Sequence, residues 1–151
     1  MGIKIDIGDL GAEIRKAKEK VEHDIIEALK YCGEQAVNYA RKHGTYKDHT
    51  ANLRSSIHYI VAKNGDILAS SEGDDPLSVT DENGETHTGD EGKATGLAYA
   101  KNLSQQEKNG FVLVVVAGMQ YAEYVERRGY DVLAGAQIET EGIFKQVIEQ
   151  L

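Results

Sequence analysis

The sequence predicts an α+β fold, in which a long N-terminal helix and a C-terminal helix pack on a small antiparallel sheet. Three observations support this prediction: residues 9–43 have helical periodicity, residues 55–69 alternate around an Asn-Gly pair, and residues 111–117 form an apolar run. A chain of 151 residues is long enough for a single hydrophobic core, so we expect one domain over residues 1–151.

The N-terminal stretch is the strongest helical signal in the chain. Its apolar residues recur at steps of three or four: Leu10, Ile14, Ala17, Val21, Ile25, Ala28, Cys32, Ala36 and Tyr39. The mean step is close to the period of a straight helix and longer than that of a coiled coil. Asp9 can cap this helix and Gly44 can end it. At about 50 Å it would be longer than such a domain is wide, so one end should overhang, fray or pack outside the chain.

Cys32 lies on the apolar stripe of this helix. We expect a reduced core residue, because no helix N-terminus or basic group adjoins it in the sequence.

Three regions of the chain have sequence patterns typical of β-strands. Residues 3–7 could form a short edge strand. Beyond the long helix, Ile57, Tyr59 and Val61 fall on one face of a strand, and an Asn64-Gly65 pair then predicts a type I′ hairpin leading into residues 67–69. The run 111–117 is apolar on both faces, which predicts the central strand of the sheet.

The net charge of −8 comes from an acidic insertion between strands, residues 66–92, here called the acidic segment. Between Asn64 and Gly92 there are nine acids and no Lys or Arg. A second Asn-Gly pair, Asn83-Gly84, lies between Thr-rich flanks poor in large apolar groups. The composition therefore predicts a projecting hairpin or a mobile acidic flap.

The C-terminal half should contain two more helices and one ambiguous element. Residues 95–108 have a helical pattern, and residues 121–126 suit either type of structure. Residues 133–151 predict the last helix, with its apolar positions at Ile138, Phe144, Val147, Ile148 and Leu151.

No sequence motif indicates catalysis, so we expect no enzymatic activity, no cofactor and no bound metal. The five histidines form no metalloprotease-type pair, and Ser55 and Ser56 are in no nucleophile motif. His43, Asp48 and His49 could ligate a metal, but a solvated loop explains them as well. The residues around Asp81 do not match an EF-hand loop. There is no basic patch for nucleic acid, no 18-residue apolar run and no signal-peptide core.

Two stretches resemble a known family. Residues 50–57, T-A-N-L-R-S-S-I, resemble the T-G-x-L-R-x-S-I segment that follows the first helix in the HK97 gp10-like family of bacteriophage tail-completion, or neck, proteins. Residues 117–129, ending in Y-A-E-Y-V-E-R-R-G, resemble its later G-x-x-Y-A-x-x-V-E-x-G segment. The departures are Ala51 in place of glycine, one extra residue before Gly129, and the acidic segment.

We call residues 50–57 the first motif and residues 117–129 the second motif. Their matching positions are Thr50, Leu53, Arg54, Ser56, Ile57, Tyr121, Ala122, Val125, Glu126 and Gly129. We expect Thr50 to cap a helical turn, Leu53 and Ile57 to point inward, and Arg54 to point outward. In the second motif Tyr121, Ala122 and Val125 should pack at helical spacing, with Glu126 exposed. Arg54 and Glu126 are predicted to be linked, as an ion pair within the chain or across a subunit boundary.

The resemblance implies a structural virion protein of a tailed phage or prophage, made in the bacterial cytoplasm. It would form a homo-oligomeric ring in tail completion or head–tail joining, in contact with the head-closure or connector protein and with the tail tube or tail terminator. The alternative is a small cytosolic enzyme or ligand-binding module, with the acidic segment as a lid or metal site.

Overall fold

The computed structural model describes residues 2, 4 and 8–150, and the side chains of residues 8–10 are not described. It confirms the α+β class: a long N-terminal helix and a C-terminal helix accompany a three-stranded antiparallel sheet, with a separate two-stranded hairpin. The predicted strand at residues 3–7 lies outside the described residues.

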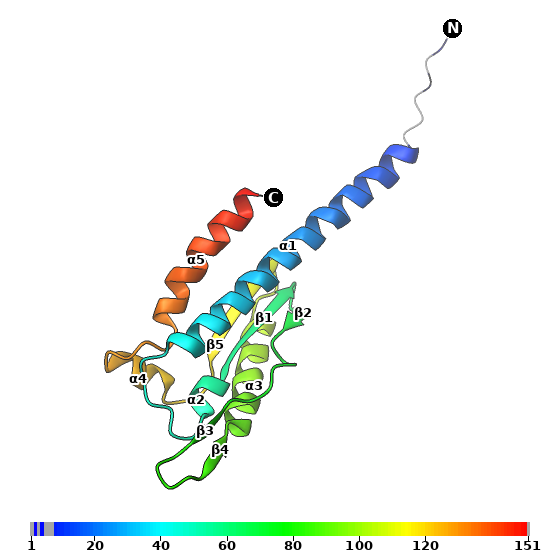
Figure 1. Ribbon diagram of the computed structural model, residues 1–151. Helices are drawn as coiled ribbons and strands as arrows, with labels where there is room; N and C mark the ends of the chain where they lie inside the picture. The colour runs from blue at the N-terminus through cyan, green and yellow to red at the C-terminus, as the bar shows by residue number, and fades with distance from the viewer. Residues whose placement is uncertain (1, 3, 5–7, 151) are drawn as a thin grey trace.

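The N-terminal helix α1 (Gly8–His43) has 36 residues and is about 54 Å long. Only its C-terminal half is packed: from Ala28 onward one face is buried, whereas Ile14 and Val21 are 59% and 57% exposed. The predicted overhang is therefore at the N-terminal end, where Figure 1 shows α1 extending beyond the rest of the molecule.

The main sheet has the strand order β2-β1-β5. Strands β1 (Ile57–Lys63) and β2 (Asp66–Ser70) form the predicted hairpin, and Asn64 and Gly65 have the positive φ angles, 52° and 89°, of a type I′ turn. Strand β5 (Phe111–Ala117) pairs antiparallel with β1 along its whole length.

The prediction that β5 is central is wrong, because β1 occupies the centre and β5 lies at an edge. The run is apolar on both faces because helices cover both faces of the sheet. Burial of the faces does not require a neighbouring strand on each side.

The molecule has three layers (Figure 1). Helices α1 and α5 (Ala134–Glu149) cover one face, where Ile57, Tyr59 and Val61 enter the main core as predicted. Helix α3 (Asp90–Gln106) covers the other face, where Ile60 and Ala62 pack against it.

The predicted start of α3 at residue 95 is wrong by five residues. Gly92 and Gly96 weaken a helical pattern, but here they allow close packing: a Cβ on them would lie 2.1 Å from the Asn52 carbonyl oxygen and 2.2 Å from that of Ser56. The acids Asp90 and Glu91, counted above in the acidic segment, form the first turn of α3, where the helix dipole favours negative charge.

Three short elements complete the fold: α2 (Asn52–Ser55), the hairpin of β3 (Ser78–Thr80) and β4 (Thr86–Thr88), and α4 (Ala122–Arg127). The ambiguous stretch around residue 124 is thus helical. In α5, Ile138 is 75% exposed, so this residue of the predicted apolar face does not pack in the core.

Candidate functional site

The two motifs form one packed region at the end of α1. Leu53 of α2 and Ala122 of α4 lie in a single apolar cluster with Tyr46 and Val132, and Val125 packs against it. Ile57, the last residue of the first motif, is fully buried in the main core. The inward positions predicted for Leu53, Ile57, Ala122 and Val125 agree with these contacts.

The predicted outward position of Arg54 is wrong, because its guanidinium binds the C-terminal end of α1. Its Nε donates to the carbonyl of Arg41 at 3.1 Å, and its Nη2 donates to the carbonyls of Gly44 at 3.0 Å and Tyr46 at 3.2 Å. The guanidinium also lies over the Tyr46 ring, 4.6 Å from its centroid. The Arg41 carbonyl lies in the last turn of α1, where carbonyls lack an intrahelical donor, and those of Gly44 and Tyr46 lie just beyond the helix. A positive charge at this end complements the helix dipole.

Helix α2 is capped mainly by Asp48 and not by Thr50. The Asp48 carboxylate accepts from the backbone N–H of Arg54 at 2.9 Å and of Leu53 at 3.4 Å. Thr50 accepts a single long bond, 3.4 Å, from the N–H of Asn52. Ala51 precedes α2 in the left-handed region, with φ of 63°, a conformation that favours glycine. The family pattern that the first motif resembles has glycine at this position.

Ser56 joins the first motif to the sheet and to α3. Its hydroxyl donates to the Leu53 carbonyl at 2.7 Å, and its own carbonyl accepts from the N–H of Gly118 at 3.1 Å. The close approach of Gly96 to this same carbonyl fixes α3 against the motif.

In the second motif, Glu126 caps the last helix. Its half-buried carboxylate accepts from the backbone N–H of Ala134 at 2.7 Å and of Leu133 at 3.3 Å, at the start of α5. The prediction that Glu126 is exposed is therefore wrong. Gly129 has φ of 91°, which explains why glycine is needed at the end of α4.

The predicted ion pair between Arg54 and Glu126 within the chain is wrong. Each of the two side chains binds backbone groups at a different helix end. No salt bridge joins Arg54 and Glu126 among the described residues. A pair across a subunit boundary stays a prediction.

Tyr121 connects the two motifs at the surface. Its side chain is 40% exposed, and its pKa is raised by partial burial and by the nearby Asp48 carboxylate, while the neighbouring Thr50 hydroxyl opposes this shift. The sequence pattern placed Tyr121 in the packed face, but the structure puts it at the rim of the cluster.

The acidic segment has more structure than its composition predicted. The β3–β4 hairpin confirms the expected turn at Asn83-Gly84, and β2 and the first turn of α3 occupy its ends. Several of its acids have basic partners: Asp74 pairs with Arg41 at 2.8 Å, Glu72 with Lys101 at 3.3 Å, and Glu82 with Lys47 at 3.7 Å. Whether the hairpin is mobile stays a prediction.

Within the described residues, one group of three metal-ligating side chains comes together: Asp81, Glu85 and His87, with ligand atoms within 4.8 Å of one another. Asp81 and His87 form a hydrogen bond at 2.9 Å, which lowers the pKa of Asp81 and raises that of His87; the contact is an ion pair when His87 is protonated. The linker residues considered above do not converge, because Asp48 caps α2 and His43 stacks on Tyr39.

Cys32 is completely buried in α1, and burial raises the pKa of its thiol. This agrees with the expected core residue. Buried thiols with a raised pKa are poor nucleophiles.

Comparison with known proteins gave no family: no family model, no curated protein and no solved structure matched the chain. The described helices include none long and apolar enough to cross a membrane.

Proposed function

We propose that this protein is a structural virion component of a tailed phage or prophage, acting as a ring subunit in tail completion or head–tail joining. The observation that carries the proposal is the pair of motif segments, which resemble the HK97 gp10-like family and occur in its order. The packing of Leu53 with Ala122 and Val125 supports it, since residues separated by about 70 positions in the chain form one unit.

The position of this unit is also consistent with a joining protein. The motif residues lie where the ends of α1, α4 and α5 meet, and the charged members Arg54 and Glu126 hold two of these helices through their backbone groups. On this proposal the motifs fix the geometry of the subunit, and its partners are the head-closure or connector protein on one side and the tail tube or tail terminator on the other.

The test is deletion of the gene from its phage or prophage, with complementation by the wild-type gene. We expect full heads and complete tails to accumulate unjoined, or tails of defective length, as seen by electron microscopy of induced lysates. Normal infectious virions from the deletion strain would overturn the proposal. The neighbouring genes supply a simpler observation, because a metabolic operon would also contradict it.

A second candidate is a ligand-binding module with a metal site in the acidic segment, favoured by the convergence of Asp81, Glu85 and His87. All three are at or near the surface, and the hydrogen bonds of the hairpin already engage Asp81. We therefore expect no stoichiometric metal. Elemental analysis of the purified protein, beside a His87→Gln variant, tests this: one Zn or Ca per wild-type chain that the variant lacks would favour the second candidate.

A further inference from the structure

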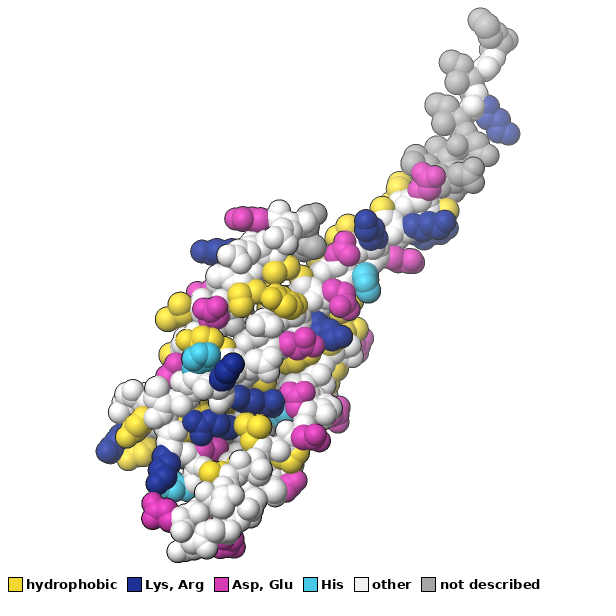
Figure 2. Space-filling view, in the orientation of Figure 1, with side chains coloured by type: hydrophobic (Ala, Val, Ile, Leu, Met, Phe, Trp, Pro, Cys, Tyr) yellow, Lys and Arg dark blue, Asp and Glu magenta, His cyan; other side chains and the backbone are white. Residues whose placement is uncertain are grey.

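The overhang of α1, residues 11–21, carries an apolar stripe that nothing in the described part of the chain covers. Ile14, Ala17 and Val21 lie on one face, and the same face continues into the core at Ile25. Figure 2 shows hydrophobic side chains along this part of the helix beside its charged ones. A helix that only extended into solvent would have no need of this stripe.

The stripe cannot fold back on its own chain. Helix α1 is continuous from Gly8 to His43, and the single proline of the chain is at position 76, in a loop. Without a break the overhang points away from the domain (Figure 1), so no described part of the same chain covers it and a second molecule can.

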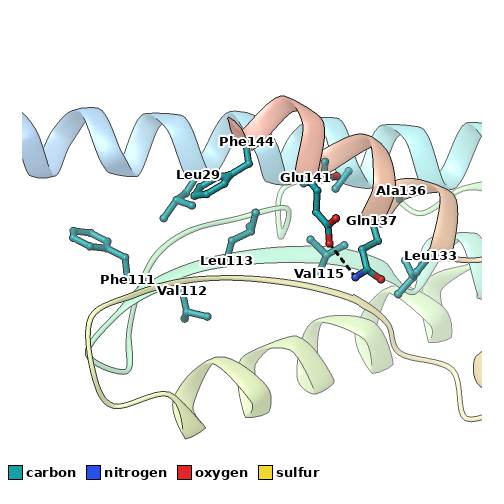
Figure 3. A pocket seen from close by; sticks show the side chains of 12 residues that line it. Leu29, Phe111, Val112, Leu113, Val115, Leu133, Ala136, Gln137, Glu141 and Phe144 are labelled. Carbon is teal, nitrogen blue, oxygen red and sulfur yellow. Dashed lines mark hydrogen bonds between the residues drawn. The ribbon is translucent and has the colours of Figure 1, made fainter. Parts of the chain in front are cut away.

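The same chain has an open apolar groove of about 520 Å³ between α5 and β5. Figure 3 shows Phe144 of α5 close to Leu29 of α1, with Phe111, Leu113 and Val115 of β5 on the opposite wall. Phe144 remains 39% exposed. The groove follows β5, whose outer edge pairs with no strand in the described chain.

The charges of the two surfaces are complementary. The overhang has four basic residues, including Lys18, against two acids, whereas α5 has three acids against one base, although the chain as a whole is acidic. Lys18 lies beside the stripe, four residues after Ile14 and three before Val21. Glu141 projects from α5 into the groove, where it accepts a hydrogen bond from Gln137 at 3.2 Å and forms no salt bridge with the described residues (Figure 3).

We propose that the overhang of one copy docks in the α5–β5 groove of a second copy, with Ile14 and Val21 as apolar anchors and Lys18 facing Glu141. An amphipathic helix in an apolar groove is a common recognition mode, with anchors at this spacing. Because overhang and groove are different surfaces of one chain, every copy offers both. Such a contact closes into a reciprocal dimer or continues into a ring. This contact would supply the self-association that the ring of the proposed function needs. The docking proposal itself rests only on the overhang and the groove.

Sedimentation equilibrium of the purified full-length protein tests the proposal. We expect a mass that is a multiple of the 16.5 kDa chain, and Val21→Asp should reduce it to that of the monomer. Position 21 is exposed in the free chain, so this variant should keep the wild-type melting temperature. His23→Asp is the matched control: it adds the same charge two residues beyond the overhang, on the opposite face of α1, and should leave the association unchanged.

Charge reversal tests the predicted pairing. Lys18→Glu and Glu141→Lys should each weaken the association about tenfold or more, and the double variant should recover most of the loss. Lys16→Glu, which lies on the opposite face of the helix, should have little effect.

A monomeric wild-type protein, or association that Val21→Asp does not change, would overturn the proposal, as would failure of the double variant to recover. Binding of the overhang by a different phage protein, with the purified chain remaining monomeric, would show that the occupant is not a second copy. None of these outcomes depends on the phenotype of the gene deletion, so the two proposals can fail separately.

Discussion

Individual charged residues in this protein act mainly on the ends of helices. Arg54 binds carbonyls at and just beyond the end of α1, Asp48 binds the first N–H groups of α2, and Glu126 binds those of α5. Each charge has the sign that the local helix dipole favours. The charged members of the two motifs are therefore explained by the fold itself, before any partner is considered.

Replacing Arg54 by Ala should lower the free energy of unfolding by about 2–3 kcal/mol, because three carbonyls lose a charged donor. Arg54→Lys should recover only part of this, since an ammonium group cannot bind all three sites in the guanidinium geometry. Urea denaturation measures both changes. Arg127→Ala is the control, because its ion pair with Glu123 is exposed. Equal stability of the Arg54 and Arg127 variants would refute the capping role.

His58 gives a prediction for pH dependence. It is 1% exposed in β1, and its Nδ1 lies 2.7 Å from the Ser71 hydroxyl. Burial, and then the positive charge of Arg41, lower its pKa from 6.5 to about 4, while Asp74 opposes the shift. The folded state therefore favours neutral His58. Its contribution to stability is complete above pH 6.5 and is lost as the pH falls towards 4.

Between pH 7.5 and pH 5 this linkage should reduce the free energy of unfolding by about 2 kcal/mol. This pH-dependent fall in the free energy of unfolding should be absent in the His58→Asn variant, whatever its stability at neutral pH. It should be present in the His87→Gln variant. NMR titration of the imidazole gives a direct measurement. A His58 midpoint near 6.5 in the folded protein would contradict the prediction.

At the scale of elements, the sequence correctly predicted those features that depend only on residues close together in the chain. The helical period of α1 and the Asn64-Gly65 turn depend on neighbouring residues only, and both were predicted correctly. The central position of β5 and the outward position of Arg54 were predicted wrongly, because both depend on which elements pack together. The early start of α3 was missed for the same reason, since Gly92 is a site of close packing that resembles a helix breaker in the sequence.

The candidate site was predictable in part. The resemblance identified both motifs, and the packing of Leu53, Ala122 and Val125 followed from their apolar character. Asp48 was missed as a cap because it lies five and six residues before its two target N–H groups and outside the motif. A local signal was available, since Asp is a preferred capping residue, but Thr50 offered a more usual spacing.

The acidic segment allows a prediction that separates its central hairpin from its two ends. Its ends are attached to the fold: the N–H of Leu77 donates to the Ser55 hydroxyl at 2.8 Å, and Gly89 lies against Ser55. The hairpin between them has few apolar contacts. Replacing residues 79–87 by a short Gly-Ser linker should change the melting temperature by about 2 °C or less, whereas replacing 72–91 should lower it by more than about 5 °C.

Differential scanning calorimetry measures both replacements. If the shorter replacement destabilises the protein as much as the longer one, the hairpin is part of the core. If neither does, the contacts at Ser55 contribute nothing to stability and the whole segment is a flap, as the composition alone predicted.

For the whole molecule, the main feature is that α1 is longer than the domain it stabilises. Its C-terminal half contributes Leu29, Val37 and Ala40 to the main core, while the overhang is exposed on all sides. If the overhang docks on a second copy as proposed, folding and assembly use different parts of one helix. An exposed amphipathic helix contributes little to the stability of the free chain, because its isolated turns are marginal in water.

Deletion of residues 2–20 should consequently change the free energy of unfolding by less than about 1 kcal/mol, because no side chain in residues 11–20 is buried. The shortened protein should also lose its self-association. Deletion of residues 2–32 is the contrasting variant: it removes Leu29 and Cys32 from the core and should leave the chain largely unfolded at room temperature. Urea denaturation and sedimentation of both proteins separate the two roles of α1. If the shorter deletion alone unfolds the domain, the overhang is part of the fold and cannot be a free docking element.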